Sequence, residues 1–226
     1  MLPIIQKTLF SIYYPYCGMV SRMLPSITLD GRKLRVLPGV YKPLDSEHHL
    51  VDFIAAGKKV LDVGCGSGVI TLFAALKSDH VTAVDISPQA IENTRQNCET
   101  HNVKNVTVKQ SDMYAAVEGE LFDYIVSYPP LFEGSFASDD KQWCTSLHFV
   151  EDLFGGAAKH LHPDGKLVVL LPQRLLNSPI DLSEKYGLQF ESAVPHHNRS
   201  LANRIHALPY LHFNMNNHVA TFSRAK

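Results

Sequence analysis

Short apolar runs alternate with longer segments of mixed polarity from residue 59 to the end of the chain. The runs with the length and composition of strands are 59–63, 80–84, 106–109, 122–127, 166–171, 189–194 and 219–222. The intervening segments with helical character are 68–77, 87–101, 145–161 and 181–186. Ser87 followed by Pro88 is a typical helix start. This alternation predicts an α/β fold with a doubly wound, mostly parallel seven-stranded sheet and an antiparallel strand near its end.

The first 46 residues have a different pattern and are predicted to form an extension. Residues 4–23 mix aromatic and aliphatic residues at roughly helical spacing, interrupted by Pro15, which indicates one or two short helices. Residues 27–36 form two alternating segments around Asp30-Gly31, a strong hairpin signal. A helix capped by Asp45 or Ser46 and running to Ala56 should follow. The predicted domains are therefore 1–46, helical and hairpin extension, and 47–226, main domain.

The composition is that of a soluble globular protein of 226 residues, with 45% hydrophobic and 19% charged residues. No apolar run reaches the roughly 18 residues that a membrane-spanning helix needs, and the N-terminus does not look like a secretory signal. The four cysteines are widely spaced and the histidines show no zinc-ligand spacing, so neither disulfides nor a metal site is expected. We expect a cytoplasmic protein without a membrane partner.

Charge is distributed unevenly along the chain, although the net charge is only −1. Residues 1–59 carry +4, residues 60–173 carry −8, and residues 174–226 carry +3. The basic ends could face an anionic substrate, but nucleic-acid readers usually have a larger basic excess. Ordinary solvated surfaces remain the simpler interpretation.

A glycine-rich turn follows the first strand of the main domain. Residues 60–68 read Val-Leu-Asp-Val-Gly-Cys-Gly-Ser-Gly, and the glycines allow the backbone to approach a ligand closely. Ligands of open parallel sheets bind at the carboxyl ends of the strands. The next two strands also end in acids there: Asp85 is followed by Ile86, and Asp112 by Met113. These three ends offer a turn, an acid for ribose hydroxyls, and an acid beside apolar side chains for a base.

Together, Asp-Val-Gly-Cys-Gly-Ser-Gly at 62–68, Val-Asp-Ile-Ser at 84–87 and Ser-Asp-Met at 111–113 resemble the class I S-adenosylmethionine-dependent methyltransferases. The resemblance covers about residues 40–172 and implies a Rossmann-like methyltransferase sheet with S-adenosylmethionine as cofactor. A dehydrogenase would require a G-x-G-x-x-G turn, which is absent here. The resemblance assigns Asp62, Gly64, Cys65 and Gly66 to the methionine part of the cofactor, and Asp85 to its ribose. It assigns Asp112 to the adenine, and the neighbouring apolar side chains of Ile86 and Met113 would hold the adenine ring.

The fourth strand ends in Ser127-Tyr128-Pro129-Pro130-Leu131. At this location the HemK-like glutamine methyltransferases and the adenine methyltransferases carry Asn-Pro-Pro-Tyr, so this small-domain group is the nearest subfamily by resemblance. Residues 39–46 are similar to the HemK-like lead-in, which places Tyr41 and Asp45 near the cofactor, as Ser127 would be. The candidate catalytic residues are Tyr128, Pro129 and Pro130.

Tyr128 stands where the family carries its catalytic asparagine. In one interpretation Tyr128 orients the acceptor or acts as a general base, and in another its ring faces the sulfonium of the cofactor. In a third, the side chain only fills space. A tyrosine hydroxyl is a weaker acceptor than an amide oxygen, and Leu131 cannot stack as an aromatic would. Both departures make methylation of glutamine or adenine less expected than the overall resemblance suggests.

Four functions therefore remain open. The leading hypothesis is a methyltransferase acting on a nitrogen of a small molecule. The second is a HemK-like enzyme that methylates an amino group of a protein or RNA. The others are an enzyme that consumes S-adenosylmethionine by a non-methyl route and a non-catalytic cofactor-binding protein. The sequence does not indicate an oligomeric state.

Overall fold

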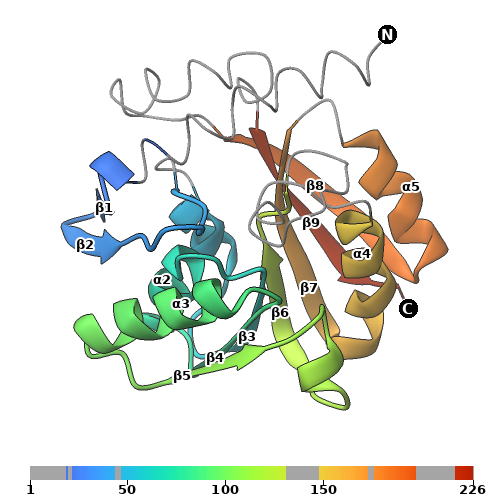
Figure 1. Cartoon of the computed structure of the whole chain (residues 1–226). Helices are drawn as coiled ribbons and strands as arrows, with labels where there is room; N and C mark the ends of the chain where they lie inside the picture. Colours follow the sequence, from blue (N-terminus) through green and yellow to red (C-terminus); the bar gives the residue numbers. More distant parts are fainter. Residues whose placement is uncertain are drawn as a thin grey trace, which may run out of the picture.

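The computed structural model describes residue 19 and residues 22–43, 47–130, 148–172, 176–196 and 217–225. Within this part of the chain, seven strands form one sheet in the order β5-β4-β3-β6-β7-β9-β8 (Figure 1). The strands are β3 (Lys59–Val63), β4 (His80–Asp85), β5 (Val106–Gln110), β6 (Phe122–Ser127), β7 (Leu161–Pro172), β8 (Leu188–His196) and β9 (Asn217–Arg224). The first five are parallel, and β9 lies antiparallel between β7 and β8. The predicted mostly parallel, seven-stranded sheet is confirmed.

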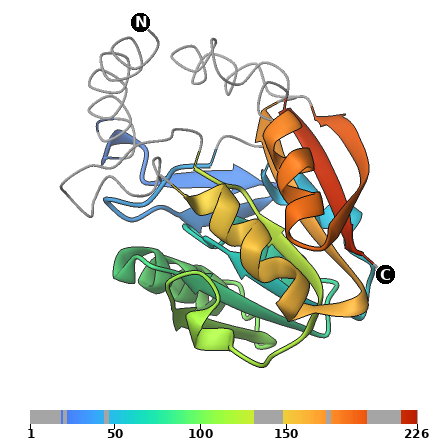
Figure 2. The ribbon, with the colours of Figure 1, turned by 90° about the vertical axis from the view of Figure 1, so that its right-hand side faces the viewer.

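Helices cover both faces of this sheet. One face carries α2 (Val69–Ala75), α3 (Pro88–Thr100) and the 3₁₀ helix η1 (Glu47–Phe53). The other carries α4 (Phe149–His160), α5 (Asn177–Lys185) and the 3₁₀ helix η2 (Ala115–Val117), and α4 and α5 face the viewer in Figure 2. Ser87 caps α3 as predicted, accepting a hydrogen bond from the backbone N–H of Ala90.

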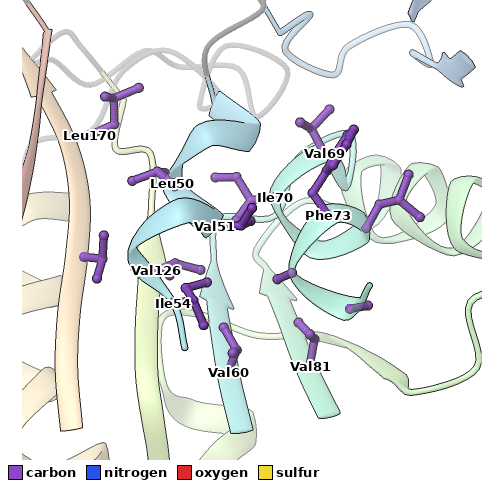
Figure 3. Close-up of a cluster of buried hydrophobic side chains, with 14 of the residues drawn as sticks. Leu50, Val51, Ile54, Val60, Val69, Ile70, Phe73, Val81, Val126 and Leu170 are labelled. Carbon is purple, nitrogen blue, oxygen red and sulfur yellow. The ribbon is translucent and has the colours of Figure 1, made fainter. Parts of the chain in front are cut away.

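The alternation of side chains along β7 divides the core into two clusters. Val168 and Leu170 pack with η1 and α2, whereas Leu167, Val169 and Leu171 pack with α4 and α5. Figure 3 shows the first cluster, in which side chains from η1, α2 and the strands meet. Because successive residues of a strand point to opposite faces, the nearly continuous apolar sequence of β7 serves both clusters.

The predicted hairpin is confirmed as β1 (Ser26–Leu29) and β2 (Arg32–Arg35). Asp30 and Gly31 form its turn with φ of 43° and 75°, as an Asp-Gly hairpin turn requires. The inner side chains Leu29 and Leu34 are buried in the same cluster as α2 and η1. The hairpin is thus packed onto the face of the sheet that α2 covers (Figure 1).

A buried asparagine on α3 connects the hairpin to the glycine turn. The Asn97 side chain accepts a hydrogen bond from Arg35 N at 2.9 Å and donates to Arg35 O and Ser67 O, both at 2.8 Å. Asn93, one helical turn earlier, accepts from Leu37 N and donates to Arg35 O. These bonds satisfy backbone groups that the hairpin could not pair itself, which makes the hairpin a rigid element.

Three predicted elements differ in the structure. The helix predicted at 181–186 is α5, which begins four residues earlier, at Asn177, and ends at Lys185. The α-helix expected to run to Ala56 is a 3₁₀ helix that ends at Phe53, and Ile54 N bonds to Val51 O with the i→i+3 spacing of such helices. Strand β7 begins at Leu161 rather than 166, because Leu161 already pairs with Phe122. The caps proposed at Asp45 or Ser46, and most of the helical segment 4–23, lie outside the described residues. None of the described helices is long and apolar enough to span a membrane.

Candidate active site

The glycine turn connects the carboxyl end of β3 to α2. Gly64 N and Cys65 N both donate to Val84 O, so the turn also joins the end of β4. Gly64 and Gly68 have φ of 79° and 80°. A Cβ on Gly68 would lie 3.0 Å from the Thr94 backbone, so a side chain is excluded by both conformation and space. The Cys65 thiol is buried and accepts a hydrogen bond from Thr94, which leaves only the Cys65 backbone facing the turn.

Asp85 lies directly beside this turn, at the end of β4. Its two carboxylate oxygens accept hydrogen bonds from Gly66 N and Ser87 N, each at 2.9 Å. Burial raises the pKa of Asp85, and these backbone bonds oppose the rise. A carboxylate has about four acceptor sites, so two remain for hydroxyl donors of a ligand. The backbone bonds fix the orientation of the acid relative to the turn.

Asp62 is a buried acid one strand away, on β3. Its Oδ2 accepts a hydrogen bond from Thr71 at 2.5 Å, whereas Oδ1 has no hydrogen-bond partner among the described residues. Burial is the main cause that raises the pKa of Asp62 to about 7, and the nearby Asp85 adds to it. A buried, half-satisfied carboxylate fits a cationic ligand group, which would both pair the free oxygen and favour the ionised form.

The end of β5 forms the next part of the same edge. Ser111 joins it to β4 through a bond from Ser111 N to Asp85 O, and its hydroxyl bonds Met113 O and Ala116 N. Met113 has a φ of 45°, unusual for a side chain of this size, and Asp112 is exposed. Ile86 has 47% of its surface exposed. An exposed isoleucine and an acid at this edge suit a planar base with an amino group.

The end of β6 brings Tyr128 and Tyr41 together. Their ring centroids are 6.0 Å apart in an edge-to-face arrangement, and the Tyr41 hydroxyl donates to the buried Glu47 at 3.3 Å. Pro129 and Pro130 follow, with Pro129 buried. The Ser127 hydroxyl is buried and donates to Val63 O at 2.8 Å, so it ties two strand ends together.

The predicted site residues that are described thus lie at the carboxyl ends of four neighbouring strands or beside them. Asp45 falls outside the described residues, as do Leu131 and the loop after it. The sequence analysis missed Thr71, Asn97 and Glu47. It also missed Phe149, whose ring would lie 3.4 Å from a Cβ on Gly64. The positions of these four residues depend on how helices pack over the glycine turn, and a local sequence motif does not predict such packing.

Residues 36–193 match the family model described as the methyltransferase small domain. The chain belongs to this family. The match covers most of the chain and includes the glycine turn, the strand-end acids and Tyr128-Pro129-Pro130. The resemblance to class I S-adenosylmethionine-dependent methyltransferases is therefore confirmed. The chain is a methyltransferase of the small-domain family, and S-adenosylmethionine is its cofactor.

Curated relatives of the small-domain chain include RNA methyltransferases. It is 30% identical over 185 residues to the tRNA1(Val) (adenine(37)-N6)-methyltransferase of Phocaeicola vulgatus, a match that covers 79% of this chain and 70% of the relative. It is 36% identical over 152 residues to the ribosomal RNA small subunit methyltransferase C of Yersinia pestis. That match covers 64% of this chain but 41% of the relative, so the chain spans less than half of the ribosomal RNA enzyme.

Solved structures share the fold of the small-domain methyltransferase. A methyltransferase from Pyrococcus furiosus matches with a TM-score of 0.66 and 21% identity, covering 96% of this chain and 98% of that one. The T. thermophilus 16S rRNA N2 G1207 methyltransferase, solved with AdoMet and guanosine, matches with a TM-score of 0.61 and 20% identity. That match covers 89% of this chain and 50% of the other.

Proposed function

We propose that this protein transfers a methyl group from S-adenosylmethionine to an exocyclic amino nitrogen of an RNA base. The observation that carries the proposal is the 30% identity, over 79% of the chain, to an enzyme named for methylating adenine N6 of a tRNA. The ribosomal RNA methyltransferases among the relatives support the same acceptor class. We therefore propose an RNA amino group as the methyl acceptor, ahead of the small-molecule nitrogen that was the leading hypothesis from the sequence.

The residues at the strand ends would hold the cofactor in three parts. Asp62 would pair the ammonium of the methionine part, since its Oδ1 is buried and lacks a partner among the described residues. Asp85 would accept hydrogen bonds from the ribose hydroxyls, in the fixed orientation that Gly66 N and Ser87 N give it. Asp112 would bind the adenine amino group, and Ile86 and Met113 would pack on the two faces of the adenine ring.

Tyr128 would position the acceptor. The bound cofactor supplies an electrophilic methyl group on a sulfonium. The protein then has to hold the amino nitrogen in line with that methyl carbon, and positioning of this kind supplies several kcal/mol of barrier reduction without a strong base. The Tyr128 hydroxyl can accept a hydrogen bond from the base amino group, as the family's asparagine oxygen does. Contact with Tyr41 and the rigid Pro129-Pro130 turn limits the movement of the Tyr128 ring.

The acceptor class is tested by offering separate pools with radiolabelled S-adenosylmethionine. Total bacterial RNA, total protein and a metabolite fraction below a few kilodaltons would each be incubated with the full chain. We expect label in RNA above that of a no-enzyme control, and S-adenosylhomocysteine in matching amount. Label only in protein or metabolites, with RNA at background, would contradict the proposal. Methylthioadenosine formed from the cofactor alone would indicate the non-methyl route instead.

Replacing Tyr128 by phenylalanine tests the role of its hydroxyl. We expect kcat on RNA to fall about tenfold, the size of one general positioning or proton-transfer contact, with S-adenosylhomocysteine affinity changed less than twofold. Tyr124→Phe, on the same strand but away from its carboxyl end, is the matched control and should retain full turnover. Equal kcat for Tyr128→Phe and the wild type would reduce Tyr128 to a packing residue.

A further inference from the structure

The β1–β2 hairpin has a polar, positively charged outer face. Ser26 is paired with Arg35 and Thr28 with Lys33, so these four side chains point to the same side of the hairpin. The opposite side holds Leu29, which is buried against the protein. Thr28, Lys33 and Arg35 are exposed. We call Ser26, Thr28, Lys33 and Arg35 the outer hairpin face.

Among the residues that the structure describes, no acidic side chain pairs with the cations of this face. Asp30 is the one acid in the hairpin sequence 25–37, and its carboxylate lies 3.4 Å from His48 Nε2. Within the described residues, Lys33 and Arg35 have no ion-pair partner at 4.0 Å or less. The acids of α3, Glu92 and Glu99, lie roughly 100° or more around the helix from Asn93 and Asn97, which hold the hairpin.

Hydrogen bonds to α3 hold the backbone of the hairpin at the two cationic residues. Arg35 is held through its backbone by Asn93 and Asn97, and Lys33 O lies 3.0 Å from His101 Nε2 at the end of α3. The two cations thus follow the length of α3, from near its middle to its carboxyl end. Their backbone positions do not have to be ordered when a ligand binds, so less conformational entropy is lost.

The hairpin is linked to the active-site edge through Asn97, which bonds Arg35 O and also donates to Ser67 O in the glycine turn. Five residues separate Arg35 from Tyr41, whose ring contacts Tyr128. From Pro88, next to the cofactor edge, α3 rises about 8 Å to Asn93 and about 20 Å to His101. At about 3.4 Å per stacked nucleotide, this length corresponds to roughly six nucleotides of one strand. A nucleic acid with one base in the active site would have its flanking phosphates within reach.

We propose that the outer hairpin face binds the phosphodiester backbone of the RNA whose base is methylated. The inference rests on the proposed function and adds the surface that recognises the acceptor. Arg35 would form a forked pair with one phosphate and Lys33 a point-charge contact with another, while Ser26 and Thr28 hydroxyls donate to phosphate oxygens. Contacts of this type position the RNA without reading its sequence, so the face contributes affinity and register rather than base selectivity.

The test compares two charge-matched double variants of the full chain. Lys33→Ala/Arg35→Ala removes two charges from the outer hairpin face. Lys159→Ala/Lys185→Ala removes two exposed charges from α4 and α5 on the opposite face of the sheet. Binding of fluorescein-labelled bulk tRNA is measured between about 50 and 200 mM KCl, where phosphate contacts dominate the salt dependence. Binding of S-adenosylhomocysteine to each variant checks that the fold is intact.

We expect the hairpin variant to bind tRNA about tenfold more weakly at 100 mM salt and to lose roughly 1.4 units of the log–log salt slope. The α4–α5 variant should keep the wild-type affinity and slope. Equal affinity and slope for wild type and hairpin variant would overturn the hairpin proposal, while RNA methylation by the wild type would still support the proposed function. A wild type that methylates protein or metabolites and not RNA would overturn both.

Discussion

Asp85→Ala is expected to lower the affinity for S-adenosylmethionine by a factor of about 100 or more. Hydrogen bonds to a charged acceptor contribute about 1.5–3 kcal/mol each, and we assign two ribose hydroxyls to this carboxylate. The variant also leaves Gly66 N and Ser87 N without their acceptor, so the glycine turn and the start of α3 lose their common support. Isothermal titration with S-adenosylhomocysteine measures the loss directly.

Two further variants separate ligand contact from damage to the turn. Asp85→Asn keeps one acceptor oxygen for a backbone N–H and should therefore fold better than Asp85→Ala, yet still bind the cofactor weakly. Asp164→Ala removes an exposed acid in β7 and should bind like the wild type. Wild-type affinity in Asp85→Ala would show that the ribose does not lie on this acid.

Asp62→Asn is expected to change stability and cofactor affinity in opposite directions. Burial raises the pKa of Asp62 to about 7 in the folded protein without cofactor, above the value of 3.8 that the group has in a model peptide. The folded state therefore favours the neutral carboxyl, and stability falls as the pH rises from about 4 to about 7. A neutral asparagine avoids this loss, which is about 4 kcal/mol at pH 8, but it leaves a buried amide N–H group without a partner, which costs about 2 kcal/mol. We therefore expect a net stabilisation of the cofactor-free protein by about 2 kcal/mol at pH 8.

The same change should weaken cofactor binding. An ammonium group pairs with the ionised carboxylate, so wild-type affinity should fall by up to about tenfold per pH unit below pH 7. In Asp62→Asn the affinity should be about 10- to 100-fold lower at pH 8 and nearly independent of this titration. Urea unfolding at pH 5.5 and 8 and titration with S-adenosylhomocysteine over the same range measure both effects. A variant that is less stable at pH 8 and binds as tightly as the wild type would contradict this role for Asp62.

Much of the architecture is predictable from the sequence because strand and helix patterns are local. Strands β3 and β6 have the predicted bounds, and the Asp30-Gly31 turn specifies its hairpin through backbone conformation alone. The strand-end acids were also predictable, because the carboxyl ends of parallel strands meet at one edge. Asp62, Asp85 and the glycine turn are adjacent for that reason.

The features that were missed depend on contacts between distant elements. From the sequence, Asn97 is an ordinary polar residue of α3. In the structure its side chain is buried, because it forms hydrogen bonds with backbone groups of Arg35 and Ser67, at sequence separations of 62 and 30. Glu47 reads as an exposed acid at the start of a helix, yet it is buried and accepts a hydrogen bond from the Tyr41 hydroxyl. The acceptor class is ranked differently by the local motif and by the overall similarity. Tyr128 in place of asparagine argues against a nucleobase, whereas the similarity to a tRNA methyltransferase over 79% of the chain favours one.

The central claim is tested most directly by locating the transferred methyl group within RNA. RNA transcribed in vitro, and therefore unmodified, would be incubated with the full chain and S-adenosylmethionine carrying a ¹³C,²H-labelled methyl group, digested to nucleosides and analysed by mass spectrometry. The account predicts a labelled base methylated on its exocyclic amino nitrogen, N6-methyladenosine foremost, and its loss in Asp85→Ala. Label on the ribose or on a ring carbon, or no labelled nucleoside while protein or metabolites are methylated, would contradict it.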